Sequence, residues 1–332
     1  MLIGAFFYKC TGKTPEWAYQ SVINLFCITG GWSNSLCSLV IGIFNGRYDP
    51  QKFTGTGVLG KINYKEAGLI ADTIKRDGYI VFENALSDSI CKFLMDFALK
   101  TPCMSRPMDG EITEENSESL MLYSIKNPVS VRYEYSRAQI LKNDDVQKLL
   151  ADPTLLMVAQ SYLGSKPIAD VMAMWWHTAF LNHPDAQAAQ YFHFDMDRFK
   201  WLKFFFYLTD VDSKSGPHVF IKGTHKNNGI PREFLKRGYA RLGDDELNEH
   251  FPNELWKKFV GPKGTLIIED TRGLHKGQHV ETGERLILQL QFSNSLFGTD
   301  AKCDTLESPL TPELELAIKK FPKTYSNFLV SK

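Results

Sequence analysis

The side chains best suited to chemistry in this sequence are a histidine and an aspartate two residues apart, His193 and Asp195. They lie in the apolar run 191–196, which is typical of a β-strand. Because the side chains of a strand alternate between its two faces, His193 and Asp195 point the same way and Phe194 points away. An imidazole and a carboxylate placed in this way can bind one metal ion, although this pattern alone is a weak indication of a metal site.

A third ligand is available at His275, in Arg272-Gly-Leu-His-Lys-Gly277, just after the expected strand 265–268. Two histidines and one carboxylate form the facial triad of non-haem Fe(II) oxygenases, which leaves three metal positions open for substrates. We therefore take His193, Asp195 and His275 as candidate metal ligands.

Arg285 follows His275 by ten residues and begins the apolar run 286–290. A cation at the start of a buried strand needs a partner, because an unpaired buried charge is costly. The carboxylate of a bound ligand would suit the planar guanidinium well. Arg285 is therefore a candidate anchor for a carboxylate.

Lys203 and Phe205 lie in the apolar run 201–208. If this strand turns both side chains inward, they could line a co-substrate or substrate site. Alternatively, the run is an edge strand whose lysine extends to water. The sequence leaves both interpretations open.

Three further residues are candidates for the substrate end of the site. Gln190 lies three residues before His193, and Trp175 and His177 lie in the preceding expected strand, 168–180. The alternative for Trp175 is an ordinary aromatic side chain of the core.

The elements that must position these residues can be read from capping signals and periodicity. Asn63 begins a helix with a capping-box pattern that Gly78 ends, and Ser87 begins a second helix. Residues 153–163 predict a third helix, and Thr311 caps a short helix near the end of the chain.

Short apolar runs separated by turn residues predict β-strands. They are residues 79–82, 168–180, 191–196, 202–208, 218–221, 265–268 and 286–292. A long polar and partly helical excursion, 227–258, interrupts them. Helices first and strands later predict a mainly β fold in which a helical layer supports a barrel or sandwich.

The composition of the chain is that of an ordinary globular protein. Of its 332 residues, 38 are Lys or Arg and 38 are Asp or Glu, so the net charge is zero, and no nucleic-acid partner is expected. The six cysteines form neither a disulfide framework nor a zinc pattern, which indicates free thiols in a reducing, cytoplasmic compartment.

The N-terminal stretch is unusual because no formal charge occurs from Trp17 to Asn45. Its longest purely apolar run, 39–44, is far shorter than the ~20 residues of a membrane span. Glu16 also interrupts the flank that a signal peptide would need. We therefore expect no stable membrane insertion and interpret residues 1–62 as an extension packed on the core, with a targeting role of residues 1–45 left open.

The ordered set of motifs resembles the phytanoyl-CoA dioxygenase-like family of Fe(II)/2-oxoglutarate-dependent oxygenases. The matching stretches are Asp77-Gly-Tyr-Ile-Val-Phe82, Gln190-Tyr-Phe-His-Phe-Asp195, Gly216-Pro217, Gly223-Thr-His-Lys226, Leu274-His-Lys-Gly277 and Gly283-Glu-Arg285. The resemblance covers about residues 65–298 and leaves residues 1–60 unexplained.

The resemblance implies a double-stranded β-helix, the cupin-like jelly roll, with flanking helices. On this basis residues 63–332 form one oxygenase domain, with helical support at 63–165, a jelly-roll core at 166–298 and a C-terminal helix at 311–321.

The resemblance also implies a role for each candidate residue. His193, Asp195 and His275 would bind Fe(II), Arg285 would bind the distal carboxylate of 2-oxoglutarate, and Arg132 lies where the family supplies a further co-substrate contact. With O2, such enzymes convert 2-oxoglutarate to succinate and CO2 while oxidising a C–H bond of the substrate. Relatives that halogenate replace the carboxylate ligand by a small residue, so Asp195 favours hydroxylation, cyclisation or desaturation.

The substrate is expected to be a small, possibly carboxylated metabolite. The basic residues expected near the pocket indicate an anionic molecule, and they are Lys126, Arg132, Arg137, Arg198, Lys200 and Lys203. Two alternatives remain: a zinc hydrolase, in which Arg285 would have no role, and a non-catalytic jelly-roll metal-binding or scaffold protein. The sequence leaves the oligomeric state open.

Overall fold

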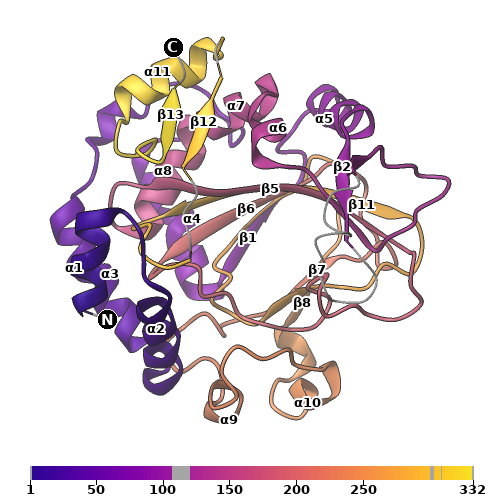
Figure 1. Ribbon diagram of the computed structural model, residues 1–332, viewed down its shortest axis with the longest axis horizontal. Helices are drawn as coiled ribbons and strands as arrows, with labels where there is room; N and C mark the ends of the chain where they lie inside the picture. Colours follow the sequence, from indigo (N-terminus) through magenta and orange to yellow (C-terminus); the bar gives the residue numbers. More distant parts are fainter. Residues whose placement is uncertain (1, 107–119, 300–302, 308, 331–332) are drawn as a thin grey trace.

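Two antiparallel β-sheets form the centre of the computed structural model, which describes residues 2–106, 120–299, 303–307 and 309–330 (Figure 1). The larger sheet has the strand order β1 (Tyr79–Phe82), β9 (Leu266–Glu269), β6 (Trp201–Tyr207), β11 (Glu284–Ser293), β5 (Ile168–Thr178), β4 (Arg132–Glu134), β2 (Cys103–Ser105) and β3 (Leu120–Met121). The smaller sheet has the order β10 (His275–Gly277), β7 (His218–Ile221) and β8 (Trp256–Phe259).

Successive strands alternate between the two sheets in the way that defines a jelly roll. From β5 the chain passes to the edge of the smaller sheet, where His193 pairs with His275, and then returns as β6. It forms β7 and β8 in the smaller sheet, and β9, β10 and β11 then lie in the larger, smaller and larger sheets in turn. The mainly β, double-stranded β-helix fold expected from the sequence is therefore confirmed.

Helices cover the outer face of the larger sheet (Figure 1). They are α4 (Tyr64–Asp77), α5 (Asp88–Lys100), α6 (Arg137–Leu141), α7 (Asp144–Leu150), α8 (Pro153–Leu163) and α11 (Pro312–Lys320). Alternation along β5 separates the two cores, because Trp176 packs outward among the helices whereas Trp175 packs between the sheets. The side chains that face the barrel interior are thus fixed by strand periodicity.

The helix starts expected from the sequence are confirmed. Asn63 and Glu66 form a capping box at α4, in which the Asn63 side chain accepts from the Glu66 amide and the Glu66 carboxylate accepts from the Asn63 amide. The Ser87 hydroxyl caps α5 and that of Thr311 caps α11. Gly78 ends α4 at a positive φ of 97°, which favours glycine.

The segment around His193 differs from its expected form. Residues 191–196 make only isolated backbone bridges, Phe192 with Leu242 and His193 with His275, and are not a regular strand. The excursion after β7 contains α9 (Arg232–Leu235), α10 (Asp244–Asn248) and η2 (Asn253–Leu255) before β8. Strand β8 was not predicted because the two adjacent lysines of Trp256-Lys-Lys-Phe259 interrupt the apolar pattern that is typical of a strand.

Residues before the barrel form three helices that sequence analysis did not predict: α1 (Leu2–Thr11), α2 (Glu16–Thr29) and α3 (Trp32–Asn45). Val22, Ile23 and Phe26 of α2 pack into a core cluster with Phe192 and Phe194. The short helix η1 (Pro50–Lys52) follows in the linker, and near the C-terminus β12 (Asp304–Leu306) pairs in parallel with β13 (Phe328–Val330).

Among the described residues, no helix by itself is long and apolar enough to cross a membrane. Only α2 and α3 taken together reach that length and apolarity, and they are bent by 119°.

Candidate functional site

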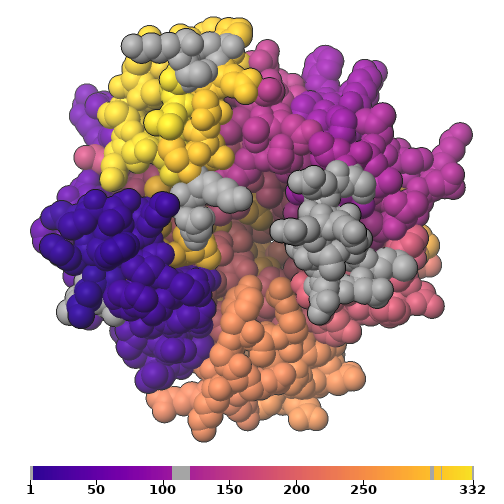
Figure 2. All heavy atoms as spheres, viewed as in Figure 1, coloured from indigo at the N-terminus to yellow at the C-terminus, as the bar shows by residue number. Residues whose placement is uncertain are grey.

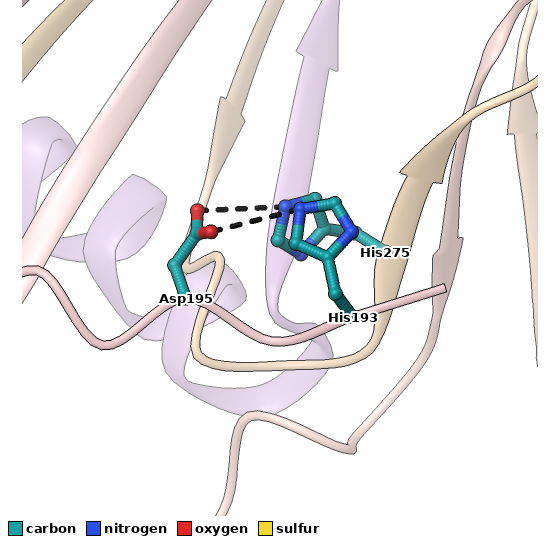
Figure 3. A group of neighbouring side chains, drawn as sticks. All are labelled: His193, Asp195 and His275. Carbon is teal, nitrogen blue, oxygen red and sulfur yellow. Dashed lines mark ion pairs between the residues drawn. The ribbon is translucent and has the colours of Figure 1, made fainter. Parts of the chain in front are cut away.

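The side chains of His193, Asp195 and His275 lie close together (Figure 3). One ligand atom from each residue lies within 4.8 Å of the others. His193 and His275 are held side by side by two backbone hydrogen bonds between them, of 3.0 and 2.9 Å. Asp195 faces both rings, with its oxygens 3.7 Å from Nε2 of His193 and 3.5 Å from Nε2 of His275.

The hydrogen bonds of the two imidazoles leave Nε2 of each free to bind a metal. Nδ1 of His193 lies 3.0 Å from the Tyr191 carbonyl oxygen, and Nδ1 of His275 lies 2.9 Å from that of Gly273. A carbonyl only accepts, so Nδ1 carries the proton and Nε2 presents its lone pair. Burial lowers the pKa of both histidines, so both rings are neutral near pH 7 and suited to coordinate a cation.

Lys203 holds the carboxylate in place. Its Nζ lies 2.6 Å from Oδ2 of Asp195 and 3.3 Å from Oδ2 of Asp197. Burial raises the pKa of Asp195, but the neighbouring Lys203 ammonium lowers it, and the net pKa lies well below the usual range. Strand β6 lies between β9 and β11 and the ammonium is buried, so the edge-strand interpretation of Lys203 is wrong.

Arg285 is buried, and no carboxylate among the described residues forms an ion pair with it. Its Nη2 is 2.8 Å from Nδ1 of His177, whereas its Nε and Nη1 have no hydrogen-bond partner among the described residues. Gly277 leaves room beside it, because an added Cβ there would lie 2.8 Å from Nη2. A buried guanidinium with unsatisfied donors beside a glycine is suited to the carboxylate of a ligand.

A second buried arginine shows how this fold satisfies a guanidinium that has only a structural role. Arg198 is as buried as Arg285, each being 1% exposed. Its Nε and Nη2 bind the Asp170 carboxylate at 2.8 and 2.7 Å, and its Nη1 binds the carbonyl oxygens of Asp197 and Thr299. Arg285 differs from Arg198 in this respect, because its Nε and Nη1 have no such partners among the described residues.

Three basic side chains form a row across neighbouring strands. His177 on β5 lies directly opposite Arg285 on β11, and Arg132 on β4 lies opposite His177. Arg132 pairs with Glu134 at 2.6 Å, and its guanidinium lies 4.7 Å from the centre of the Trp175 ring. Because Nδ1 of His177 accepts from Arg285, its Nε2 carries the proton, and this buried donor has no partner among the described residues.

These side chains enclose a cavity of about 270 Å³. The sequence-predicted residues that line it are His193, Asp195, His275, Arg285, Lys203, Phe205, Arg132, Trp175 and His177. The space-filling view is hollowed near its centre, over the region between the two sheets (Figure 2). His177, which is expected at the substrate end, lies within hydrogen-bonding distance of Arg285.

Gln190 does not line the cavity, and neither do four of the basic residues expected near it, Lys126, Arg137, Arg198 and Lys200. The side-chain oxygen of Gln190 accepts from the Asp185 amide at 2.7 Å, so it fixes the turn that precedes His193.

Sequence analysis missed His218 and Glu269. His218 lines the cavity, stacks on His275 with ring centres 5.6 Å apart, and binds the Glu269 carboxyl at 2.9 Å. Burial lowers the pKa of His218 to about 3 and raises that of Glu269 to about 8, so both groups are uncharged near pH 7. An acid at the end of the apolar run 266–269 was the available signal for Glu269.

Comparison with known proteins places the site in context. The model of the family described as Phytanoyl-CoA dioxygenase (PhyH) matches residues 74–285, which include the three candidate ligands and Arg285. No curated protein matches the sequence.

Several solved structures resemble the chain at low identity. EctD from S. alaskensis with 2-oxoglutarate and 5-hydroxyectoine is 21% identical over 74% of this chain and 81% of that chain, with a TM-score of 0.46. HygX from Streptomyces hygroscopicus with nickel and 2-oxoglutarate is 14% identical over 68% of this chain and 87% of that chain, with a TM-score of 0.47. The epimerase SnoN from nogalamycin biosynthesis, with Fe3+, alpha ketoglutarate and nogalamycin RO, is 17% identical over 69% of this chain and 83% of that chain, with a TM-score of 0.45.

Proposed function

The chain belongs to the phytanoyl-CoA dioxygenase family, a family of 2-oxoglutarate-dependent non-haem iron oxygenases, and from this premise we propose the reaction that its site performs. The enzyme oxidises an unactivated C–H bond of a small metabolite by hydroxylation, cyclisation or desaturation, and releases succinate and CO2. His193, Asp195 and His275 bind Fe(II), and Arg285 binds the distal carboxylate of 2-oxoglutarate.

The observation that carries this proposal is the convergence of two Nε2 lone pairs and one carboxylate within 4.8 Å. Two nitrogens and one oxygen on one side of a cation are the donor set of a 2-His-1-carboxylate iron site. The unpaired donors of Arg285 provide a second fit, because 2-oxoglutarate supplies the carboxylate that the protein lacks there. The residues present therefore suit both the metal and the co-substrate.

Iron and 2-oxoglutarate, when bound, supply the oxidising chemistry with O2, and the residues of the chain position the reactants. Lys203 donates to Oδ2 of Asp195, and Oδ1 would remain available to bind the metal. Arg285, which His177 holds through Nη2, would offer its free Nε and Nη1 donors to one carboxylate. Phe205 and Trp175 form apolar walls that exclude water from the cavity.

The charge of the substrate is limited by the number of basic side chains near the cavity that are not already paired with a carboxylate of the protein. Of the basic residues expected near the pocket, Arg198 is bound to Asp170, Arg137 pairs with Asp304, and Lys203 pairs with Asp195. Arg132 lines the cavity but shares its charge with Glu134. We propose a small substrate with at most one anionic group, which Arg132 would face.

The test is anaerobic titration of the protein with Fe(II) and 2-oxoglutarate, followed by visible absorption. We expect a charge-transfer band that is lost in His193→Ala and weakened in Arg285→Ala. His279→Ala is the matched control, since His279 lies outside the cavity lining, and it should keep the band. Iron binding without the band would refute the co-substrate site, and absence of iron binding would leave the non-catalytic jelly-roll protein as the better interpretation.

A further inference from the structure

Helix α3 turns its apolar side chains outward and its polar side chains inward. Its large apolar side chains, between 44% and 84% exposed, recur at a helical spacing that places them on one face, and they are Trp32, Leu36, Leu39, Val40, Ile43 and Phe44. The residues of α3 that are buried are Asn34 and Ser38. A surface helix of a globular protein usually has the opposite arrangement, with its apolar face towards the core.

Specific hydrogen bonds fix this orientation. The Asn34 side chain donates to the Phe199 carbonyl oxygen at 3.2 Å, and the Ser35 hydroxyl donates to the Asn227 side chain at 2.9 Å. At the end of the helix, the Asn45 side chain donates to the Asn294 carbonyl oxygen at 3.0 Å. The polar face of α3 is thus matched to the barrel, and its apolar face is held outward.

The neighbouring helices extend the apolar surface. Helix α1 packs on α2 and α2 on α3, and the three lie together at one side of the molecule (Figures 1 and 2). They expose further large apolar side chains at Ile3, Phe6, Phe7, Trp17 and Ile28. Eleven of the 23 exposed large apolar side chains among the described residues therefore lie before residue 46, a concentration that marks an interaction surface.

The charges around this surface suit an anionic phospholipid bilayer. No charged residue occurs from Trp17 to Asn45, whereas Lys9, Lys13 and Arg47 flank the stretch and Glu16 is the only acid before Arg47. Three basic residues and one acid give residues 1–47 a net charge of +2. Basic residues beside an apolar helical face, with tryptophans among the exposed side chains, are typical of helices that lie in a membrane interface.

A cavity beneath α3 adds a second, independent feature. It has a volume of about 650 Å³ and is lined by Leu39, Ile43, Arg47, Lys200 and Arg272, among other residues. Leu39 and Ile43 belong both to this lining and to the exposed apolar face of α3. Because the lining combines apolar and basic side chains, the complementary ligand is an anion attached to an apolar chain.

Lys200 and Arg272, two of the cations that line this cavity, differ in their partners. Arg272 is bound to the Asp270 carboxylate. Lys200 donates to the Tyr162 carbonyl oxygen at 2.7 Å and forms no ion pair with a carboxylate among the described residues. Burial lowers the pKa of Lys200 to about 7, which an anion in the cavity would oppose.

We propose that α1, α2 and α3 dock this enzyme on the surface of an anionic phospholipid bilayer, with α3 lying in the interface and a lipid headgroup of net negative charge entering the cavity at Lys200. The apolar side chains of α3 enter the boundary between headgroups and acyl chains, and no helix crosses the bilayer. Docking of this kind requires no change in the barrel, because α3 already presents its apolar face outward.

The test is sedimentation of the full chain with vesicles of phosphatidylcholine and phosphatidylserine, compared with phosphatidylcholine alone. We expect binding to the anionic vesicles that the double variant Leu39→Ser/Ile43→Ser weakens by about tenfold or more. The matched control is Leu69→Ser/Leu316→Ser, which alters two similarly exposed leucines on α4 and α11 and should bind like the wild type. Thermal unfolding of each variant verifies that the fold is retained.

A second pair of variants tests the anionic part of the proposal. Lys200→Gln and, separately, Arg47→Gln should weaken binding to the phosphatidylserine vesicles, as should added salt. Equal binding to both vesicles, unaffected by these substitutions, would refute a headgroup site. The docking proposal itself would be refuted by no binding to either vesicle, or by a dimer in light scattering that Leu39→Ser/Ile43→Ser dissociates, since the surface would then join two copies of the chain.

Discussion

The interior of the barrel and the N-terminal helices depart from the usual distribution of polarity in opposite directions. Between the sheets, Lys203, Asp195 and Arg285 occupy positions where a core holds apolar side chains. On α3, Leu36 and Phe44 occupy positions where a surface holds polar ones. Both arrangements are unfavourable for the isolated chain, so each marks a place where something outside the chain completes the structure.

Each region also contains a similar side chain or helix whose groups are matched within the protein itself. Arg198 is buried and fully bonded, whereas Arg285 is equally buried and partly unbonded. Helix α2 buries Val22 and Phe26 against the segment that carries His193, whereas α3 turns its apolar face away from the protein. Arg198 is therefore the control for the proposed role of Arg285, and α2 is the control for that of α3.

The largest effect on stability is expected at Arg198. Arg198→Met leaves the Asp170 carboxylate buried without its cation, which should lower the free energy of unfolding by about 3–5 kcal/mol. Arg285→Met, the matched change, should lower it by less than about 1 kcal/mol, because the protein supplies no anion there. Urea denaturation of both variants measures the difference, and equal losses would mean that Arg285 is also a structural residue.

For co-substrate binding, the large effect is expected at Arg285 and not at Arg198. Arg285→Met removes charge-assisted hydrogen bonds to 2-oxoglutarate, and we expect its dissociation constant to rise about 100-fold. Isothermal titration of the metal-loaded protein measures this constant. Unchanged affinity in Arg285→Met would remove Arg285 from the co-substrate site.

A smaller effect is expected at the lysine that orients the carboxylate ligand. Lys203→Met frees Asp195 to rotate and should weaken Fe(II) binding by about 10- to 100-fold. Lys222→Met, which alters a lysine paired with Asp77 outside the cavity, is the control and should bind Fe(II) normally. Competition with a chelator measures both, and equal affinities would show that Lys203 does not position Asp195.

Between the two regions, the ion pair of Asp270 and Arg272 should give stability that depends on pH. Burial raises the pKa of Asp270, but the Arg272 guanidinium has the larger, opposite effect, and the net pKa is about 2 compared with an ordinary 3.8. The pair contributes fully above about pH 4, and about 2 kcal/mol of stability is lost as the pH falls through 2. Unfolding free energies of the wild type and Asp270→Asn should converge over this range, and parallel curves would contradict the assignment.

The smallest effect is expected on the exposed face of α3. Leu36→Gln should change the free energy of unfolding by less than about 0.5 kcal/mol, since the side chain has no role in the packed core. Val22→Ala on α2 should cost more than 1 kcal/mol, because Val22 lies in a core cluster. Thermal or urea unfolding compares the two, and a large loss in Leu36→Gln would mean that α3 is held by contacts of its apolar face.

The sequence by itself predicted a mainly β fold with a supporting helical layer and the residue types of the proposed triad, and the order of its motifs gave the family resemblance that implied a jelly roll. Short apolar runs between turn residues identified most of the main strands, and capping residues such as Asn63 and Thr311 identified the starts of helices. These features depend on neighbours within a few positions, so a single sequence contains the information that they need.

Only the tertiary structure decided which residues meet across the barrel and which face of α3 turns outward. His177 reaches Arg285 across 108 positions of sequence, and Asn34 reaches Phe199 across 165. Pairing of distant strands fixes such contacts, and a shift of one residue in register would turn His177 out of the cavity. The apolar face of α3 points outward because the polar groups opposite it find partners on the barrel, and those partners exist only once the chain has folded.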